Sequence, residues 1–359
     1  MSITLEKNII ENENNLLDKS TLEGIRKVIS KEYFKPSTGL ALFYTFSGTT
    51  FYIFSLFILA YTYINNIYWA WPFAYFLAGT AVTSLFVLGH DCGHQSFLKN
   101  NKLNDILGHL FFIAPIYPYY GWKFSHNAHH KHTNKLIVNP NDIYYDNAWI
   151  PLTIEKYKEL KRNNSFFAFL YKLSRYFPPI GSFFHNIITH FIPSKFNESQ
   201  RKKVVLSQIL LAISMICIFS FSIYYDSIYA FFHFYIIPAL FFQFWMSIYT
   251  YQHHTSEEMK FYNEEEWNQY KAQINSTYNS LFPRWLSFLH FNIDIHTPHH
   301  LSTAIPSYYL RNAYKQLKNS PYKDDILENK FSIKYYLKQV RSCHIWDEAN
   351  NKYKRFEDI

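Results

Sequence analysis

The chain has 359 residues, is 48% hydrophobic and 21% aromatic, and carries a net charge of +8. The basic residues are scattered through Tyr-rich and Phe-rich stretches without a nucleic-acid recognition module, so we expect no nucleic-acid partner and assign the basic excess to membrane-facing and cytosolic surfaces. The three cysteines, Cys92, Cys217 and Cys343, lie far apart. This spacing excludes a disulfide framework and a CxxC zinc site, and it suits a reducing compartment.

Residues 1–38 are predicted to form a cytoplasmic N-terminal segment. The segment begins with a polar, acidic stretch that has no apolar core, so we expect no cleavable signal peptide. A capping-box pattern at 20–23 then starts an apolar helical face that includes Ile25 and Ile29. We therefore expect a short amphipathic helix on the membrane surface, ending near Glu32 ahead of Pro36.

Four apolar stretches without Lys, Arg, Asp or Glu follow. Each approaches or exceeds the roughly 20 residues that a helix needs to cross a bilayer. A buried core helix could also be this apolar, but four such stretches in one chain favour membrane spans. The predicted spans are 39–64, 69–88, 204–223 and 229–251.

The connections between these spans predict the topology. The short links at 65–68 and 224–228 hold no Lys or Arg, so every basic residue lies on the other side, which the positive-inside rule makes cytoplasmic. We therefore expect an all-α integral-membrane fold with four transmembrane helices in two hairpins. In this prediction the membrane domain covers 39–359, its cytoplasmic, histidine-rich helical cap comprises 89–203 and 252–359, and both termini are cytoplasmic.

Two further apolar stretches are too short or too interrupted to span. They cover 106–120 and 165–193, and the second contains Lys172, Arg175 and a Pro-Pro pair. We interpret both as interfacial or re-entrant segments.

The histidines are the main functional signal. Three clusters and one further histidine, just past the end of the fourth predicted span, all fall on the predicted cytoplasmic side. Residues at i and i+3 or i+4 share a helical face, so each cluster can direct several imidazoles to one centre, although Pro298 leaves either a turn or a helix start for the third cluster. The candidates are His90, His94, His126, His129, His130, His253, His296, His299 and His300.

Metal binding is the function that this arrangement favours. Eight or nine imidazoles exceed the four ligands of one tetrahedral zinc ion and suit two metal ions. Imidazole binds zinc, copper, iron and nickel, so the residues alone do not select the metal.

The chain resembles the membrane fatty-acid desaturases, and in particular the cyanobacterial Δ12 acyl-lipid branch. The resemblance is carried by HDCGHQSF at 90–97, GWKFSHNAHHKHTNK at 121–135 and HTPHHLSTAIPSYYLRNAY at 296–314. It extends over nearly the whole chain from about residue 20. The four-residue spacing of the first box is typical of the acyl-lipid branch, whereas acyl-CoA desaturases carry a longer box.

The resemblance implies a non-haem di-iron centre. The family takes one ligand from the cytoplasmic end of its fourth span; His253 fits that place best, and His254 is the competitor. Asp91 is a candidate to hold an imidazole, with a solvent-facing or capping carboxylate as the alternative, and His132 is a weaker candidate for the same role. The ligands implied are His90, His94, His126, His129, His130, His253, His296, His299 and His300.

The implied reaction is O2-dependent desaturation of a lipid-linked acyl chain, oleoyl to linoleoyl at the Δ12 position. Two irons, reduced by an external donor, activate O2, and two hydrogens leave neighbouring methylenes. No acid–base residue is expected beyond the metal ligands. No fused cytochrome b5 pattern or CxxC-type iron–sulfur site is visible, so we expect ferredoxin, or alternatively cytochrome b5, as a separate donor.

Two alternatives compete with this hypothesis. A related di-iron membrane oxygenase, such as an acyl or alkane hydroxylase or a carotenoid oxygenase, would share the metal site and differ in how it holds the substrate. A histidine-rich metal transporter would require ionisable residues along its spans. The predicted spans offer only His233 and no carboxylate, which disfavours the transporter.

Overall fold

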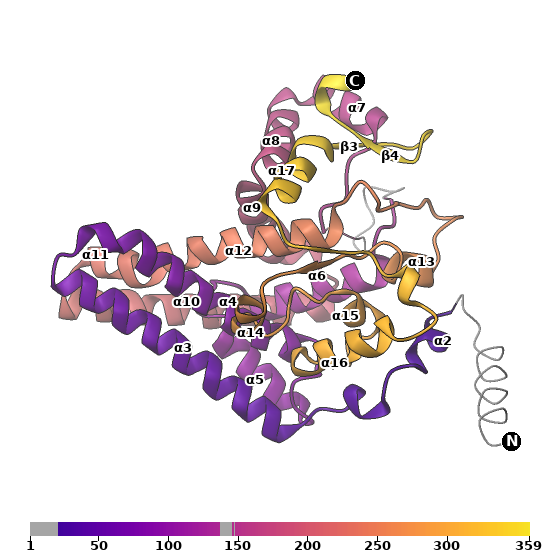
Figure 1. The fold of residues 1–359 in the computed structure, drawn as a ribbon. Coiled ribbons are helices and arrows are strands. Elements are labelled where there is room, and N and C mark those ends of the chain that lie inside the picture. Colours follow the sequence, from indigo (N-terminus) through magenta and orange to yellow (C-terminus); the bar gives the residue numbers. More distant parts are fainter. Residues whose placement is uncertain (1–20, 137–145, 147) are drawn as a thin grey trace, which may run out of the picture.

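The computed structural model describes residues 21–136, 146 and 148–359. Its helices include four that are long and apolar enough to cross a membrane, which confirms the predicted all-α membrane class. The four helical segments are Thr38–Ile64, Tyr68–Gly93, Glu198–Tyr225 and Ile228–His254. In Figure 1 they lie side by side toward the left, and most of the remaining elements lie to the right and at the top.

Each long segment extends beyond the apolar stretch that predicted it, because helix-compatible polar residues continue the backbone hydrogen bonding. The extensions matter most at the C-terminal ends of the second and fourth segments, where they carry histidines. The segments consist of α3 (Thr38–Ile64), the 3-10 turn η2 (Tyr68–Ala70) with α4 (Trp71–Gly93), α10 (Glu198–Tyr225), and α11 (Ile228–Phe231) with the π-turn η4 (Phe232–Ile236) and α12 (Ile237–His254).

Helix α4 is the central helix of the bundle. Most of its membrane-length window is buried, whereas α3 and α10 expose most of theirs. Small residues allow α12 to approach α4 closely: a Cβ on Gly79 would lie 2.9 Å from the carbonyl carbon of Phe241. On the outer helices, large apolar side chains such as Phe46 and Ile216 are exposed. A lipid environment satisfies this apolar outer surface, so the chain is an integral membrane protein.

The remaining elements form a cap at one end of the bundle, with small β-pairs between helices. Strands β1 (Asn279–Leu281) and β2 (Glu328–Lys330) pair in parallel, and β3 (Ile345–Asp347) and β4 (Lys352–Lys354) pair antiparallel. The other elements are α5 (Asn101–Phe111), α6 (Tyr119–His132), α7 (Ile154–Asn163), α8 (Ser165–Tyr176), α9 (Pro178–His190), η3 (Pro193–Lys195), α13 (Gln269–Gln273), α14 (Arg284–Leu289), α15 (Thr297–Leu301), α16 (Ser307–Lys318), η5 (Lys323–Asp325), α17 (Ile333–Ser342) and η6 (Phe356–Asp358).

The N-terminal helix differs from the expectation. Of the predicted 1–38 segment, residues 1–20 lie outside the described residues. Helix α2 covers only Leu22–Arg26, capped by Thr21, whose hydroxyl accepts a hydrogen bond from the amide of Gly24; a separate 3-10 turn, η1, follows at Lys31–Phe34. Ile25 and Ile29 are buried in a cluster that includes residues of α16, so the apolar face packs on the protein itself. The predicted interfacial stretches 106–120 and 165–193 form helices: α5 and α6 include parts of the first, and α8 and α9 fall within the second.

Candidate metal centre

Four helix ends bring the histidine clusters together. His90 lies in the last turn of α4, and His94 is its C-cap; the chain leaves the helix through Gln95, which adopts a left-handed φ of 60°. Helix α6 carries the second cluster in its last two turns, and α12 ends at the His253-His254 pair. The third cluster forms the short helix α15, so Pro298 stands at a helix start, where proline is tolerated.

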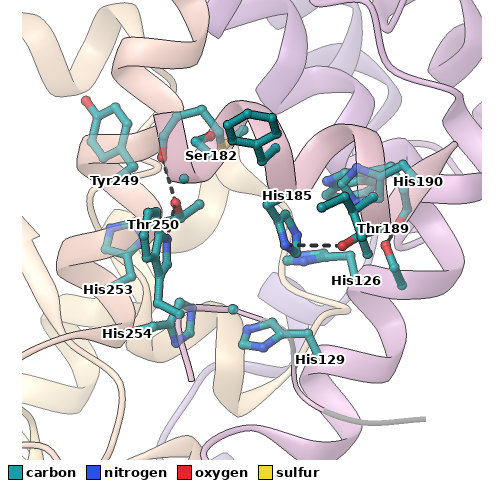
Figure 2. A pocket seen from close by; sticks show the side chains of 18 of the residues that line it. His126, His129, Ser182, His185, Thr189, His190, Tyr249, Thr250, His253 and His254 are labelled. Carbon is teal, nitrogen blue, oxygen red and sulfur yellow. Dashed lines mark hydrogen bonds between the residues drawn. The ribbon is translucent and has the colours of Figure 1, made fainter. Parts of the chain in front are cut away.

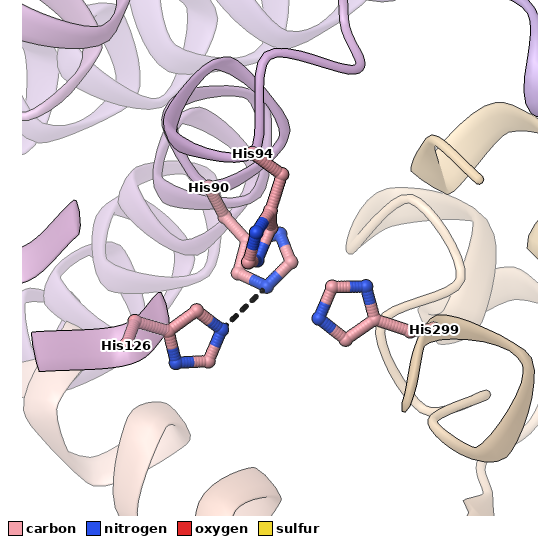
Figure 3. Close-up of side chains that lie close together, drawn as sticks. All are labelled: His90, His94, His126 and His299. Atoms are coloured by element: carbon pink, nitrogen blue, oxygen red, sulfur yellow. Dashed lines mark hydrogen bonds between the residues drawn. The ribbon is translucent and has the colours of Figure 1, made fainter. Parts of the chain in front are cut away.

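The first group of side chains contains His90, His94, His126 and His299, drawn in Figure 3. Each offers one ring nitrogen, and these nitrogens all lie within 4.8 Å of one another. Nε2 of His90 is 3.2 Å from Nε2 of His126. The group therefore combines all three sequence clusters.

The second group contains His129, His254, His296 and His300, and its four ligand atoms also lie within 4.8 Å of one another. Nε2 of His129 is 3.3 Å from Nε2 of His300, and Nε2 of His296 is 2.9 Å from Nε2 of His254. All four side chains are buried. This group draws on α6, α12 and α15.

Two predicted ligands, His130 and His253, belong to neither group. The ring of His130 lies between the groups, 4.5 Å from that of His299 and 4.3 Å from that of His300, centroid to centroid. The ring of His253 stacks on His296 at 4.0 Å, while its neighbour His254, the competitor in the sequence analysis, supplies the grouped nitrogen.

Carboxylate and amide side chains orient several of these rings. Oδ1 of Asp146 is 2.6 Å from Nδ1 of His129, and Oε1 of Gln273 is 2.6 Å from Nδ1 of His300. Asp91, a predicted orienting residue, has Oδ1 3.1 Å from Nδ1 of His90. A partner of this kind at Nδ1 fixes the tautomer and leaves the Nε2 lone pair directed into the group. His132, the other candidate, is the last residue of α6 and belongs to neither group.

Asp146 and Gln273 were not predicted. Asp146 stands alone in the sequence, 17 residues after His129, and no spacing rule links the two. Gln273 lies on the short helix α13 and also donates from Nε2 to the carbonyl of His130. An amide or carboxylate far from a cluster gives no local signal, so only the folded chain reveals these contacts.

The electrostatics favour the neutral form of six of these rings. For six of these histidines, all outside the spanning segments, burial lowers the pKa well below 6.5, and repulsion between neighbouring imidazoles lowers it further. Neutral imidazole is the form that binds a metal ion. The pKa is lowered in this way for His94, His126, His130, His296, His299 and His300.

The residues present fit metal ions. Both ring nitrogens of His94 and Nε2 of His299 in the first group are buried without a hydrogen-bond partner, as are Nδ1 of His254 and Nδ1 of His296 in the second. Buried polar atoms are normally satisfied, so buried ring nitrogens without partners in both groups are consistent with bound metal ions. Two groups of four imidazoles match two metal ions, and imidazole suits iron among other transition metals.

A cavity of about 470 Å³ lies beside both groups. Figure 2 shows His126 and His185 on one side of this space, Tyr249, Thr250 and His253 on another, and His129 and His254 next to each other. The rest of the lining is mostly apolar and comes from α4, α8, α9 and α12. A largely apolar pocket with a few convergent polar groups is typical of a small-molecule site.

Fold and site together define a class: a helical integral-membrane protein with a buried, histidine-rich metal site next to an apolar cavity. The fatty acid desaturase family model matches residues 66–332. An sn-1 oleoyl-lipid 12-desaturase of Synechocystis sp. is 34% identical over 94% of this chain and 92% of its own length. One from Picosynechococcus sp. is 36% identical over 77% of each chain, and a chloroplastic omega-6 fatty acid desaturase of Arabidopsis thaliana is 33% identical over 94% of this chain and 72% of its own. The chain belongs to the fatty acid desaturase family and is an oxidoreductase.

Proposed function

We propose that this enzyme introduces the Δ12 double bond into oleoyl chains esterified to membrane lipids. The observation that carries the proposal is the apolar cavity lined by histidines of both groups. The printed names of the similar cyanobacterial and chloroplast proteins support an oleoyl substrate and the ω-6 position.

We assign one iron ion to each histidine group. His90, His94, His126 and His299 would hold the first, and His129, His254, His296 and His300 would hold the second. His130 lies between them and is the ninth imidazole available to either ion. His254 replaces His253 in this assignment because its nitrogen, and not that of His253, converges with the other three.

When bound and reduced, the irons supply the oxidising chemistry with O2, and two electrons and two protons complete the conversion of O2 and one acyl CH2–CH2 unit to CH=CH and two water molecules. The chain supplies the geometry. Asp146, Asp91 and Gln273 hold the rings of His129, His90 and His300 in place through their Nδ1 atoms. The rings of Phe86, Trp122 and Tyr249 line the cavity and exclude water from the reacting methylenes.

The lining also favours a lipid-linked substrate. Helices α8 and α9 contribute to the cavity, and several of their apolar side chains are exposed: Phe167 by 56%, Phe184 by 40% and Ile188 by 48%. These three residues belong to the cavity lining and also to an apolar outer surface that suits the membrane interface. An acyl chain can enter sideways from the bilayer past these helices, without passing through water.

We place the cap, both termini and the histidines on the cytoplasmic side, because the basic residues concentrate there and the links at 65–68 and 224–228 have none. A cytoplasmic cap gives a soluble ferredoxin, or alternatively cytochrome b5, access to the metal site.

The test is a fatty-acid profile. The chain is expressed with ferredoxin in a host rich in oleoyl lipids that makes no dienes, and mass spectrometry locates any new double bond. We expect a 9,12-diene, which disappears in the His129→Ala variant. A hydroxylated product would indicate a related di-iron hydroxylase instead of a desaturase. An unchanged fatty-acid profile from metal-loaded protein with a working electron donor would overturn the proposal.

A further inference from the structure

Arg175 is a buried cation without an anionic partner among the described residues. It lies in the last turn of α8, is 2% exposed, and lines the same cavity as the histidines. Its Nη2 donates to the carbonyl of Trp149 at 2.9 Å, and its Nε donates to the hydroxyl of Tyr171 at 3.2 Å. The third nitrogen, Nη1, is buried and has no hydrogen-bond partner.

This arrangement holds the guanidinium ready for an acceptor. The rings of Trp149 and Tyr171 lie 6.0 and 5.3 Å from its central carbon, within cation–π range. Trp149 keeps a left-handed φ of 60°, which is uncommon for a bulky residue, while its carbonyl accepts from Arg175 and its indole donates to Thr250. Side chain and loop are thus fixed before any ligand arrives.

The described residues of the cavity lining provide no counter-charge for this cation. Among the described residues of the lining, Asp146 is the one carboxylate, and it is occupied by the imidazole of His129 and the backbone amides of Asn134 and Ala148. Lys195 adds a second cation to the lining. An arginine stays charged in proteins, and a buried charge normally has a partner. None of the described residues supplies an acceptor for Nη1 of Arg175, and a molecule that enters the cavity can supply one.

We propose that Arg175 binds an oxygen at the polar end of the acyl lipid, either the ester carbonyl or a headgroup phosphate, and so sets how far the chain reaches past the histidines. The planar fork of arginine suits both acceptors. This inference rests on the proposed function, because it takes the acyl lipid as the cavity's ligand. It makes Arg175 a substrate-binding residue at the end of the cavity opposite the methyl end of the chain.

The experiment uses the full-length holoenzyme in nanodiscs with its electron donor. Dioleoyl phosphatidylglycerol, or a dioleoyl galactolipid that has no phosphate, is diluted into a saturated lipid, and the apparent KM is measured as a mole fraction. Arg175→Gln is compared with Arg175→Lys and with Arg162→Gln, an exposed arginine on α7. Metal content is measured for every variant.

We expect Arg175→Gln to raise the apparent KM about ten-fold or more, because a hydrogen bond from a charged group is lost, with kcat and metal content nearly unchanged. Arg175→Lys should be intermediate, and Arg162→Gln should match the wild type. A rise for both lipids identifies the ester carbonyl, and a rise for phosphatidylglycerol alone identifies the phosphate. An unchanged KM for both lipids, or a lower kcat at unchanged KM, would overturn the proposal.

A second measurement covers the case in which Arg175→Gln does not fold. The wild-type protein is photo-crosslinked with an oleoyl glycerolipid that carries a diazirine on its glycerol. Labelling of the peptides around Trp149 and 171–175 supports the proposal, and labelling confined to other segments overturns it. A wild type that makes no diene but labels at Arg175 refutes the proposed function alone; a diene with an unaltered KM in Arg175→Gln refutes only the role of Arg175.

Discussion

Oδ1 of Asp146 lies 2.6 Å from Nδ1 of His129, and both side chains are almost completely buried. The same carboxylate accepts hydrogen bonds from the backbone N–H groups of Asn134, at 2.6 Å, and Ala148, at 2.9 Å. Both of these amides donate to Asp146, and the contact with His129 leaves Nε2 of that ring to face the second group. Asp146 links the loop after α6 to the metal centre.

Replacing Asp146 with Asn tests this link. The amide keeps the size of the side chain but removes its charge and places an NH2 group against a donor. We expect a roughly 10- to 100-fold loss in metal affinity or activity, the usual cost of removing such a partner. The loss of metal is measured as metal per protein by mass spectrometry, and the loss of activity is measured as the turnover rate. Asp324→Asn, at an exposed position, is the matched control; full metal and normal turnover in Asp146→Asn would contradict the assignment.

The adjacent pair His253 and His254 gives a second prediction. His254→Ala removes a nitrogen that converges with three others, so we expect loss of activity and of about one of the two metal ions. His253→Ala removes a ring stacked on His296, and the metal should remain. The two variants change adjacent residues of the same type, so each serves as the control for the other. If His254→Ala keeps both metal ions and His253→Ala loses metal, the ligand is His253, as the sequence analysis favoured.

The sequence predicted the spans well because membrane insertion depends on length and apolarity, which are local properties. It also predicted that the histidine clusters would meet, since each lies beside a predicted span end or in the cap. It did not predict how they divide: His126 joins the first group and His129 the second, although they share one helix. That division depends on the rotation of α6 against α4 and α15, which no local pattern encodes.

The remaining differences have the same origin. The N-terminal helix ends at Arg26, earlier than its pattern indicated, and Ile25 and Ile29 are both buried in a cluster that includes residues of α16. Arg175 was noted only as an interruption of an apolar stretch, and its place in the cavity follows from the packing of α8 beside the loop at Trp149. Positions whose partners are distant in sequence were the ones missed.

The contact between α4 and α12 predicts a stability effect at Gly79. A side chain there would meet the backbone of Phe241, which cannot rotate away, so α12 would have to shift. We expect Gly79→Val to destabilise the protein by about 1–3 kcal/mol, as overpacking commonly does. Thermal unfolding in detergent measures the change. Gly39→Ala is the control, because a Cβ at Gly39 meets nothing within 4 Å; an equal effect in both variants would contradict close packing at Gly79.

The position of Thr83 in the cavity predicts which acyl chain lengths the enzyme accepts. Thr83 lines the cavity and is 2% exposed; it lies seven residues before His90 on α4, or about 10 Å at 1.5 Å per residue. Six carbons beyond the Δ12 position of an 18-carbon chain must fit on the methyl side of the metal site, and the space toward Thr83 is where we place them. A larger side chain at Thr83 should shorten that space.

We therefore expect Thr83→Phe to lower activity on 18-carbon chains about ten-fold relative to 16-carbon chains, because the longer chain would clash at its methyl end while the metal content stays normal. Thr83→Val keeps the shape, loses only the hydroxyl that donates to the carbonyl of Gly79, and should keep the wild-type profile. Competition between the two chain lengths, read by mass spectrometry, gives the ratio. An unchanged ratio in Thr83→Phe would show that the methyl end lies elsewhere, and the chain would then have to run in another direction from the histidines.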